Sequence, residues 1–350
     1  MNFVPKLSIF ITALSIAVCG VAAPNADLSG TYDSGTVTPL ERPEAFGDKQ
    51  FMSAEEAQST LAALEEKRRL ANQESDPDRG APVVGGDGNL NSGAGGVGGY
   101  NQFWVDPGSV LSEVDGKVRT SIIYEPTNGR RPKFTFDALM KLADTYRSYR
   151  TPNDGTANWL AKRGPGPYDG PESLAPPERC LMSFTPSVPN IPGLYNNYRR
   201  IVQTDSHVMI LNEMVHDARI IRIDSAHAPG ALKSRLGDSV GHWEGNTLVV
   251  NTKNFSSVNS LPGADENLEV TEYLTRLDDG NLHYRFTIVD PSAWKEQWSG
   301  EYIWQSKNED KVYEYACHEG NYAMKGILQG ARLLEKETLA KEKTETPNAS

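Results

Sequence analysis

A histidine and a glutamate stand side by side near the C-terminus, in the stretch YEYACHEGNYAM. His318 and Glu319 lie between Cys317 and Gly320, where a short β-prone run changes to a helical pattern. A histidine at a helix N-terminus suits a general base or a hydrogen-bond donor, because the helix dipole favours its neutral form. The same position also suits a capping glutamate and a histidine that only ties the loop to the fold.

Zinc chemistry is not indicated by the spacing of these residues. The pair begins like the HExxH motif of zinc peptidases, but Tyr322 occupies the place of the second histidine. None of the six histidines in the chain shows the spacing of a zinc site. We therefore expect neither a metal nor another cofactor, and proton transfer is the candidate chemistry.

Two further carboxylates fall on apolar faces of predicted strands. Glu272 alternates with apolar residues in LEVTEYLTRL, and Glu213 shares a face with Met209 in HVMILNEM. A carboxylate inside a barrel costs several kcal/mol unless it is paired, so each needs a partner or a function. The arginines near enough in sequence to pair with them are Arg219, Arg222 and Arg276.

The run LGDSVGHWEGNTLVVNT gathers three more acid–base groups. Asp238, His242 and Glu244 share one face of a predicted strand, and Trp243 lies on the other. Three such groups on one side suit proton transfer or polarisation of a substrate. The alternative is a hairpin turn at EGN with solvated charges.

The N-terminus has the layout of a cleavable secretory signal. Residues 1–23 carry one lysine, then an apolar run that is too short for a membrane span, and then small residues. We therefore expect a periplasmic or secreted protein. Its net charge of −11 argues against nucleic acid and anionic membranes as partners and leaves a small molecule.

Two cysteines remain after the signal, Cys180 and Cys317. An even pair in an exported chain predicts one disulfide. The alternative is two separate buried thiols.

Composition divides the rest of the chain into three parts. We predict an N-terminal extension over residues 24–100, in which a helix (53–75) precedes a glycine-rich linker (80–99). The linker contains a literal GxGxxG, but no strand precedes it and no helix follows, so a nucleotide site is not indicated. Residues 101–342 form the main domain, and 343–350 a disordered tail.

Short β-prone runs recur from residue 198 to residue 317, separated by turn signals such as DDGN and EGN. This texture predicts a mainly β fold, an antiparallel lipocalin-like barrel or strongly curved sheet. The last run is KVYEYAC (311–317), and a helix over about 321–341 follows it. Helices are thus expected at both ends of the barrel domain.

The stretches GDSVGHWEGNTLVVNTKNF and EYACHEGNYAMKGILQGAR resemble a family of exported, largely uncharacterised bacterial proteins. The signatures of that family are GDSxGxWEGDTLVVDT and YACHEGNY. The resemblance implies an exported protein with a lipocalin-like β core, and it implies no reaction. The chain departs from the usual pattern at His242, Asn246 and Asn251. It matches at Asp238, Trp243, Glu244, His318, Glu319, Asn321 and Arg332.

Two functions are compatible with these residues. The first is a cofactor-free lyase, isomerase or hydrolase for a small organic substrate. In it His318 moves the proton, Glu319 orients His318, and Asp238 or Glu244 is the complementary acid. The second is a lipocalin-like periplasmic binding protein for an apolar or aromatic ligand. The candidate binding residues are Trp243, Asn321, Arg332, Glu213 and Glu272.

Overall fold

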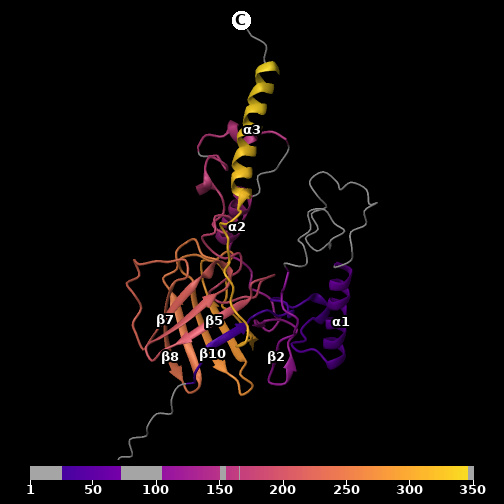
Figure 1. Ribbon diagram of the computed structural model, residues 1–350, viewed down its shortest axis with the longest axis vertical. Helices are drawn as coiled ribbons and strands as arrows, with labels where there is room; N and C mark the ends of the chain where they lie inside the picture. The colour runs from indigo at the N-terminus through magenta and orange to yellow at the C-terminus, as the bar shows by residue number, and fades with distance from the viewer. Residues whose placement is uncertain (1–25, 72–104, 150–154, 165, 346–350) are drawn as a thin grey trace, which may run out of the picture.

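A closed barrel of nine strands is the centre of the part of the chain that the computed structural model describes, residues 26–71, 105–149, 155–164 and 166–345 (Figure 1). The order around the barrel is β1-β5-β6-β7-β8-β9-β10-β11-β12, and β1 pairs with β12 to close it. The predicted mainly β barrel is confirmed. Of the neighbouring strands in the described barrel, only β7 and β8 run parallel. The strands are β1 (Gly30–Asp33), β5 (Tyr198–Gln203), β6 (His207–Asn212), β7 (Ala218–Ile223), β8 (Asp238–Glu244), β9 (Thr247–Lys253), β10 (Glu269–Arg276), β11 (Leu282–Val289) and β12 (Trp298–Ser306).

Alternation of apolar and polar residues builds the barrel wall. Along β11, every second residue from Leu282 to Ile288 is fully buried, while those between them face outward. Aromatic rings from neighbouring strands meet inside, with the centroids of Tyr284 and Trp304 4.7 Å apart. A Cβ added at Gly300 would lie only 2.4 Å from the ring of Phe286. This part of the interior is therefore filled by side chains.

The N-terminal segment contributes to the barrel, contrary to the predicted extension over residues 24–100. β1 lies between β5 and β12, and its Tyr32 is buried with the hydroxyl donating to the Leu28 carbonyl at 3.0 Å. β1 has only four residues, which are too few to show the alternation of apolar and polar residues that predicted the other strands. The predicted first helix is present as α1 (Ala54–Ala71), which begins with reciprocal bonds between Ser53 and Glu56. The predicted signal and the glycine-rich linker lie outside the described residues.

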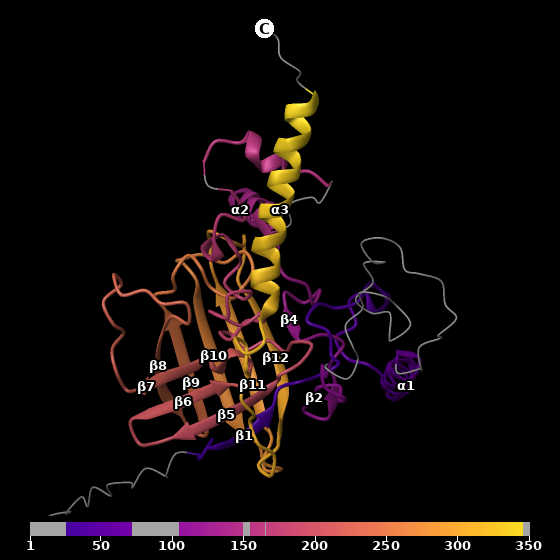
Figure 2. The same ribbon diagram turned by 45° about the horizontal axis from the view of Figure 1, so that its top comes forward.

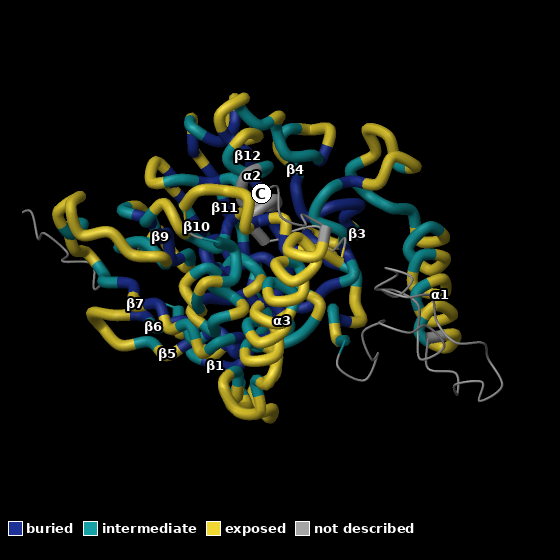
Figure 3. The backbone as a smooth tube through the Cα atoms, turned by 90° about the horizontal axis from the view of Figure 1, so that it is seen from above, coloured by how far each residue is buried: buried dark blue, intermediate teal, exposed yellow. Residues whose placement is uncertain are grey.

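Smaller elements cover one side of the barrel. β2 (Glu113–Val114) and β3 (Lys117–Val118) form a hairpin, and β4 (Ile123–Glu125) pairs with the first residues of β12. α2 (Phe136–Tyr149) lies at one end of the barrel, and α1 stands to the side with most of its surface exposed (Figures 2 and 3). Among the described residues, no helix is long and apolar enough to cross a membrane.

The prediction of a strand at residues 311–317 is wrong. β12 is already paired with β11, β1 and β4, so the closed barrel offers this segment no free edge. The segment crosses the barrel end as a loop, where the Tyr315 N–H donates to Nε2 of His216 at 3.0 Å. α3 (Tyr322–Glu345) then projects away from the barrel (Figure 1), so residues 343–345 of the predicted tail are helical. Its middle packs on residues 155–164, where the Trp159 indole donates to Glu335 at 2.9 Å.

Candidate binding groove at the disulfide-linked end of the barrel

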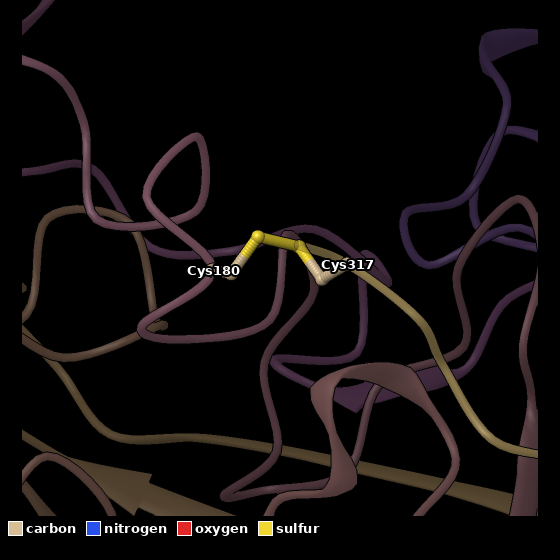
Figure 4. Close-up of a disulfide and its surroundings, with 2 residues drawn as sticks. All are labelled: Cys180 and Cys317. Atoms are coloured by element: carbon tan, nitrogen blue, oxygen red, sulfur yellow. A yellow bond between two sulfur atoms is a disulfide. The ribbon is translucent and has the colours of Figure 1, made fainter. Parts of the chain in front are cut away.

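The predicted disulfide joins Cys180 to Cys317, with 5.9 Å between the Cα atoms (Figure 4). Cys180 lies in the long loop that precedes β5, and Cys317 in the segment that leads into α3. The bond therefore fixes the start of α3 against a loop that is far from it in sequence. The prediction of a disulfide is confirmed.

A groove of about 410 Å³ lies beside this disulfide. The long loop forms one wall and the first turns of α3 form the other. Phe184 is 54% exposed and Ile327 is 38% exposed, so both rims present apolar surface to a ligand. The apolar lining residues are Leu174, Pro177, Phe184, Ala323, Met324 and Ile327.

Two of the predicted residues, Glu319 and Asn321, line this groove. Glu319 is exposed and makes no hydrogen bond or ion pair with any described residue. The other lining carboxylate, Glu178, accepts a hydrogen bond from the Ala175 N–H at 3.0 Å. His318 is exposed beside the groove and is not among its lining residues. Glu319 is thus a carboxylate that a bound molecule could use as an acceptor.

The complementary acids predicted from the sequence lie elsewhere. Asp238 is on the outer face of β8, where Arg222 donates to both carboxylate oxygens at 2.8 and 3.2 Å. The Arg222 guanidinium is the main reason that the pKa of Asp238 lies well below its ordinary value. Glu244 is exposed at the end of β8, 3.0 Å from Nε2 of His242. Neither lines the groove, so the structure does not bring the four proposed catalytic residues together.

Glu272 lies inside the barrel and has an arginine partner, as required for a buried carboxylate. Both terminal nitrogens of Arg219 donate to it, and the Tyr284 hydroxyl donates to Oε1 at 2.6 Å. Glu272 and Tyr284 are fully buried, and Arg219 is almost fully buried. This network is part of the packed interior and lines no groove with Glu319.

Glu213 does not share an inward face with Met209, contrary to the prediction. β6 turns Val208 and Ile210 inward and leaves Met209 half-buried on the outside. Glu213 follows the strand in a turn, where it accepts from the Tyr198 N–H at 3.4 Å and burial raises its pKa. Glu213 does not line the groove.

The last two predicted binding residues also stand apart from the groove. Trp243 is half-buried and packs on the barrel core. Arg332 is on α3, where it donates to the Tyr168 carbonyl at 3.0 Å and to Glu335 at 2.6 Å. Both stabilise local packing.

The GDSVG stretch also matches the GxSxG pattern of serine hydrolases letter for letter. Ser239 nevertheless lies within β8, is 2% exposed and has its hydroxyl 2.8 Å from that of Thr252. A nucleophile elbow needs an exposed serine at a turn between strand and helix, so this serine does not fit that role. Among the described residues, no three His, Cys, Asp or Glu side chains are grouped to hold a metal ion.

Sequence reasoning missed His227, which contacts Asp238 directly. Its Nδ1 lies 2.8 Å from Oδ2 of that carboxylate. The residue stands in an irregular segment without strand periodicity, so nothing in the pattern joined it to Asp238.

No protein-family model matches the chain, and a search of curated proteins finds no relative. The resemblance to exported bacterial proteins stays a prediction.

Proposed function

We propose that the protein binds a small apolar or aromatic molecule in the groove beside the Cys180–Cys317 disulfide. The observation that carries this proposal is the apolar lining on opposite walls, with Glu319 unpaired at the edge. Ligand sites are mostly apolar and carry a few polar groups that fix orientation. The ligand therefore has an apolar body and a hydroxyl or amine that donates to Glu319.

A groove on the outside is a better place for this ligand than the barrel interior. In barrels that hold a ligand, the interior is wide enough to leave a cavity. Here Tyr284, Phe286 and Trp304 fill the middle with ring contacts, and the Arg219–Glu272 pair occupies part of the rest. The proposed site therefore differs from the lipocalin-like site inside the barrel.

Binding is favoured over acid–base catalysis by the same geometry. General acid–base chemistry needs its groups within hydrogen-bond reach of one substrate. Glu319 lines the groove and His318 lies beside it, whereas Asp238 and Glu244 are engaged on the barrel wall. Disulfides persist in oxidising compartments, so we place the function in the periplasm or outside the cell.

Titration with N-phenyl-1-naphthylamine, which fluoresces in apolar surroundings, tests the groove. We expect saturable fluorescence that Ile327→Asp weakens by about tenfold or more, because a charge is placed against the apolar body. Leu333→Asp is the matched control, since Leu333 is 59% exposed on α3 and lines no part of the groove. Equal effects of the two substitutions, or no saturable binding, would refute the proposal.

Competition by two matched naphthalenes tests the polar end. We expect 2-naphthylethylamine to displace the dye better than 2-ethylnaphthalene, because its amine can donate to Glu319. Glu319→Gln should remove most of the difference, and Glu337→Gln, an exposed position further along α3, should keep it. A preference for the amine that survives Glu319→Gln would contradict this role of Glu319.

A further inference from the structure

One histidine beside the barrel wall lies between two hydrogen-bond acceptors. His227 belongs to the crossover segment (residues 224–237), which connects the parallel strands β7 and β8. Its Nδ1 lies 2.8 Å from Oδ2 of Asp238, and its Nε2 lies 2.9 Å from Oδ1 of Asn251. The His227 side chain is only 14% exposed, so water does not readily replace either partner.

The partner atoms are fixed as acceptors by their other contacts. Asp238 is held ionised by Arg222, and an ionised carboxylate can only accept. Asn251 directs its Nδ2 at Oε1 of Glu269 at 2.7 Å, and reversing the amide would set oxygen against carboxylate. The amide oxygen of Asn251 therefore faces His227. Both acceptors are satisfied only when both ring nitrogens carry a proton.

The charges around the ring come from four strands. Two carboxylates and two cations face this part of the wall, so their charges balance. The doubly protonated ring of His227 is therefore favoured by its two hydrogen bonds and not by an excess of negative charge. These groups are Arg222 on β7, Asp238 on β8, Lys253 opposite Asp238 on β9, and Glu269 on β10. Lys233, in the crossover segment, is paired with Glu266 instead.

We propose that His227 is a pH-sensitive latch that fastens the crossover segment to the barrel wall when its ring is doubly protonated. The Asp238 carboxylate also accepts a hydrogen bond from the Ala228 N–H at 2.9 Å, and Arg222 donates to the Ala226 carbonyl at 2.9 Å. When the ring loses a proton, one acceptor loses its donor and the attachment weakens. The latch is therefore strongest while both ring nitrogens carry a proton, and it weakens when either proton is lost.

The crossover segment also forms one wall of a second groove, of about 390 Å³. Residues 234–237 of the crossover segment form that wall, and Ala218 and Ile220 on β7 lie opposite. Arg235 also donates to the Leu181 carbonyl at 3.0 Å, and Leu181 follows the disulfide-bonded Cys180. Ser234 is held separately, since its N–H donates to the Asn254 carbonyl at 3.1 Å, so the latch acts on the part of the segment that precedes this wall.

Nitrogen-15 spectra of the unaltered protein test the protonation directly. At pH 5.5 we expect both ring nitrogens of His227 to have the chemical shifts of protonated nitrogen. By pH 8 we expect one of the two nitrogens to have lost its proton. Protection of the Ala228 amide from hydrogen exchange, corrected for intrinsic rates, should fall about fivefold over this range. A ring in one neutral tautomer at pH 5.5, or unchanged protection, would overturn the proposal.

Three substitutions sharpen the test. His227→Gln should abolish the pH dependence of Ala228 protection, and Asn251→Asp should move its midpoint up by about one pH unit by adding a carboxylate. His242→Gln, which changes an exposed histidine paired with Glu244, should leave the dependence unchanged. A pH dependence that persists in His227→Gln, or a midpoint unmoved by Asn251→Asp, would assign the effect to another group.

Discussion

Two arginines of β7, three residues apart, each hold a carboxylate with two nitrogens, one inside the barrel and the other outside. Arg219 points inward to Glu272 on β10, and the side chains are 4% and 0% exposed. Arg222 points outward to Asp238 on β8, where the exposures are 33% and 13%. The bonding is nearly the same, and the surroundings differ.

The surroundings decide what each pair can do. Inside, the charges have lost their water, so each depends on the other and on the Tyr284 hydroxyl. Outside, water screens the pair, and its carboxylate is shared with a segment between two strands. The inner pair is a fixed part of the core, while the outer pair can respond to its conditions.

Breaking the inner pair should have the largest effect. Glu272→Leu leaves Arg219 buried without its partner and should lower the free energy of unfolding by about 3–5 kcal/mol. The double substitution Arg219→Met/Glu272→Leu should recover most of this loss, because no charge then stays buried. Urea denaturation measures the free energy of unfolding of both variants. A double variant as unstable as the single one would show that the pair stabilises the barrel through side-chain packing and not by compensating a buried charge.

Breaking the outer pair should cost less. Asp238→Asn should lower the free energy of unfolding at pH 7 by about 1–2 kcal/mol, since Arg222 and the crossover segment lose a charged acceptor. A loss as large as that of Glu272→Leu would remove the distinction between the two surroundings.

Acid should also reveal the outer pair. Because the folded-state pKa of Asp238 is depressed, chiefly by Arg222, its contribution to stability is complete above its ordinary pKa of 3.8. The contribution is lost as pH falls below that value through the lower folded-state pKa. In unfolding measured from pH 7 to pH 2, the unaltered protein should lose more stability than Asp238→Asn. Parallel curves would contradict the depressed pKa.

The smallest effect is expected further along β8. His242 and Glu244 are 54% and 65% exposed, and their contact should contribute no more than about 0.5 kcal/mol. Glu244→Gln should therefore leave the urea midpoint almost unchanged. A larger loss would mean that exposure alone does not separate strong from weak pairs on this strand.

Alternation in the sequence predicted the inner pair but not the inward face of β6. Around Glu272 the two faces differ, with Val270 and Leu274 on one side and polar residues between them, so the period-2 pattern identified a buried carboxylate. Along β6 both Met209 and Ile210 are apolar, so the pattern could not tell which face is inward. The false strand at 311–317 has another cause, since local sequence carries no information on whether a partner edge is free.

The site was predictable only where covalent chemistry or adjacency in sequence fixed it. The two cysteines beyond the predicted signal allow one pairing, and Glu319 and Asn321 reach the groove because they follow within four residues of Cys317. Asp238 is a carboxylate within a signature stretch, yet its position depends on packing between distant segments. His227 lies in irregular structure, where no periodicity links it to a partner.

The pairing of β1 with β12 has a consequence for how the chain is made. Tyr32 lies between Arg199 and Ser306, so the first strand to leave the ribosome finds its second neighbour only when the last strand follows. Until then the growing chain has two unpaired strand edges, which favour association with other chains. Completion of the barrel is therefore a late event, and a chain that ends before residue 298 cannot reach it.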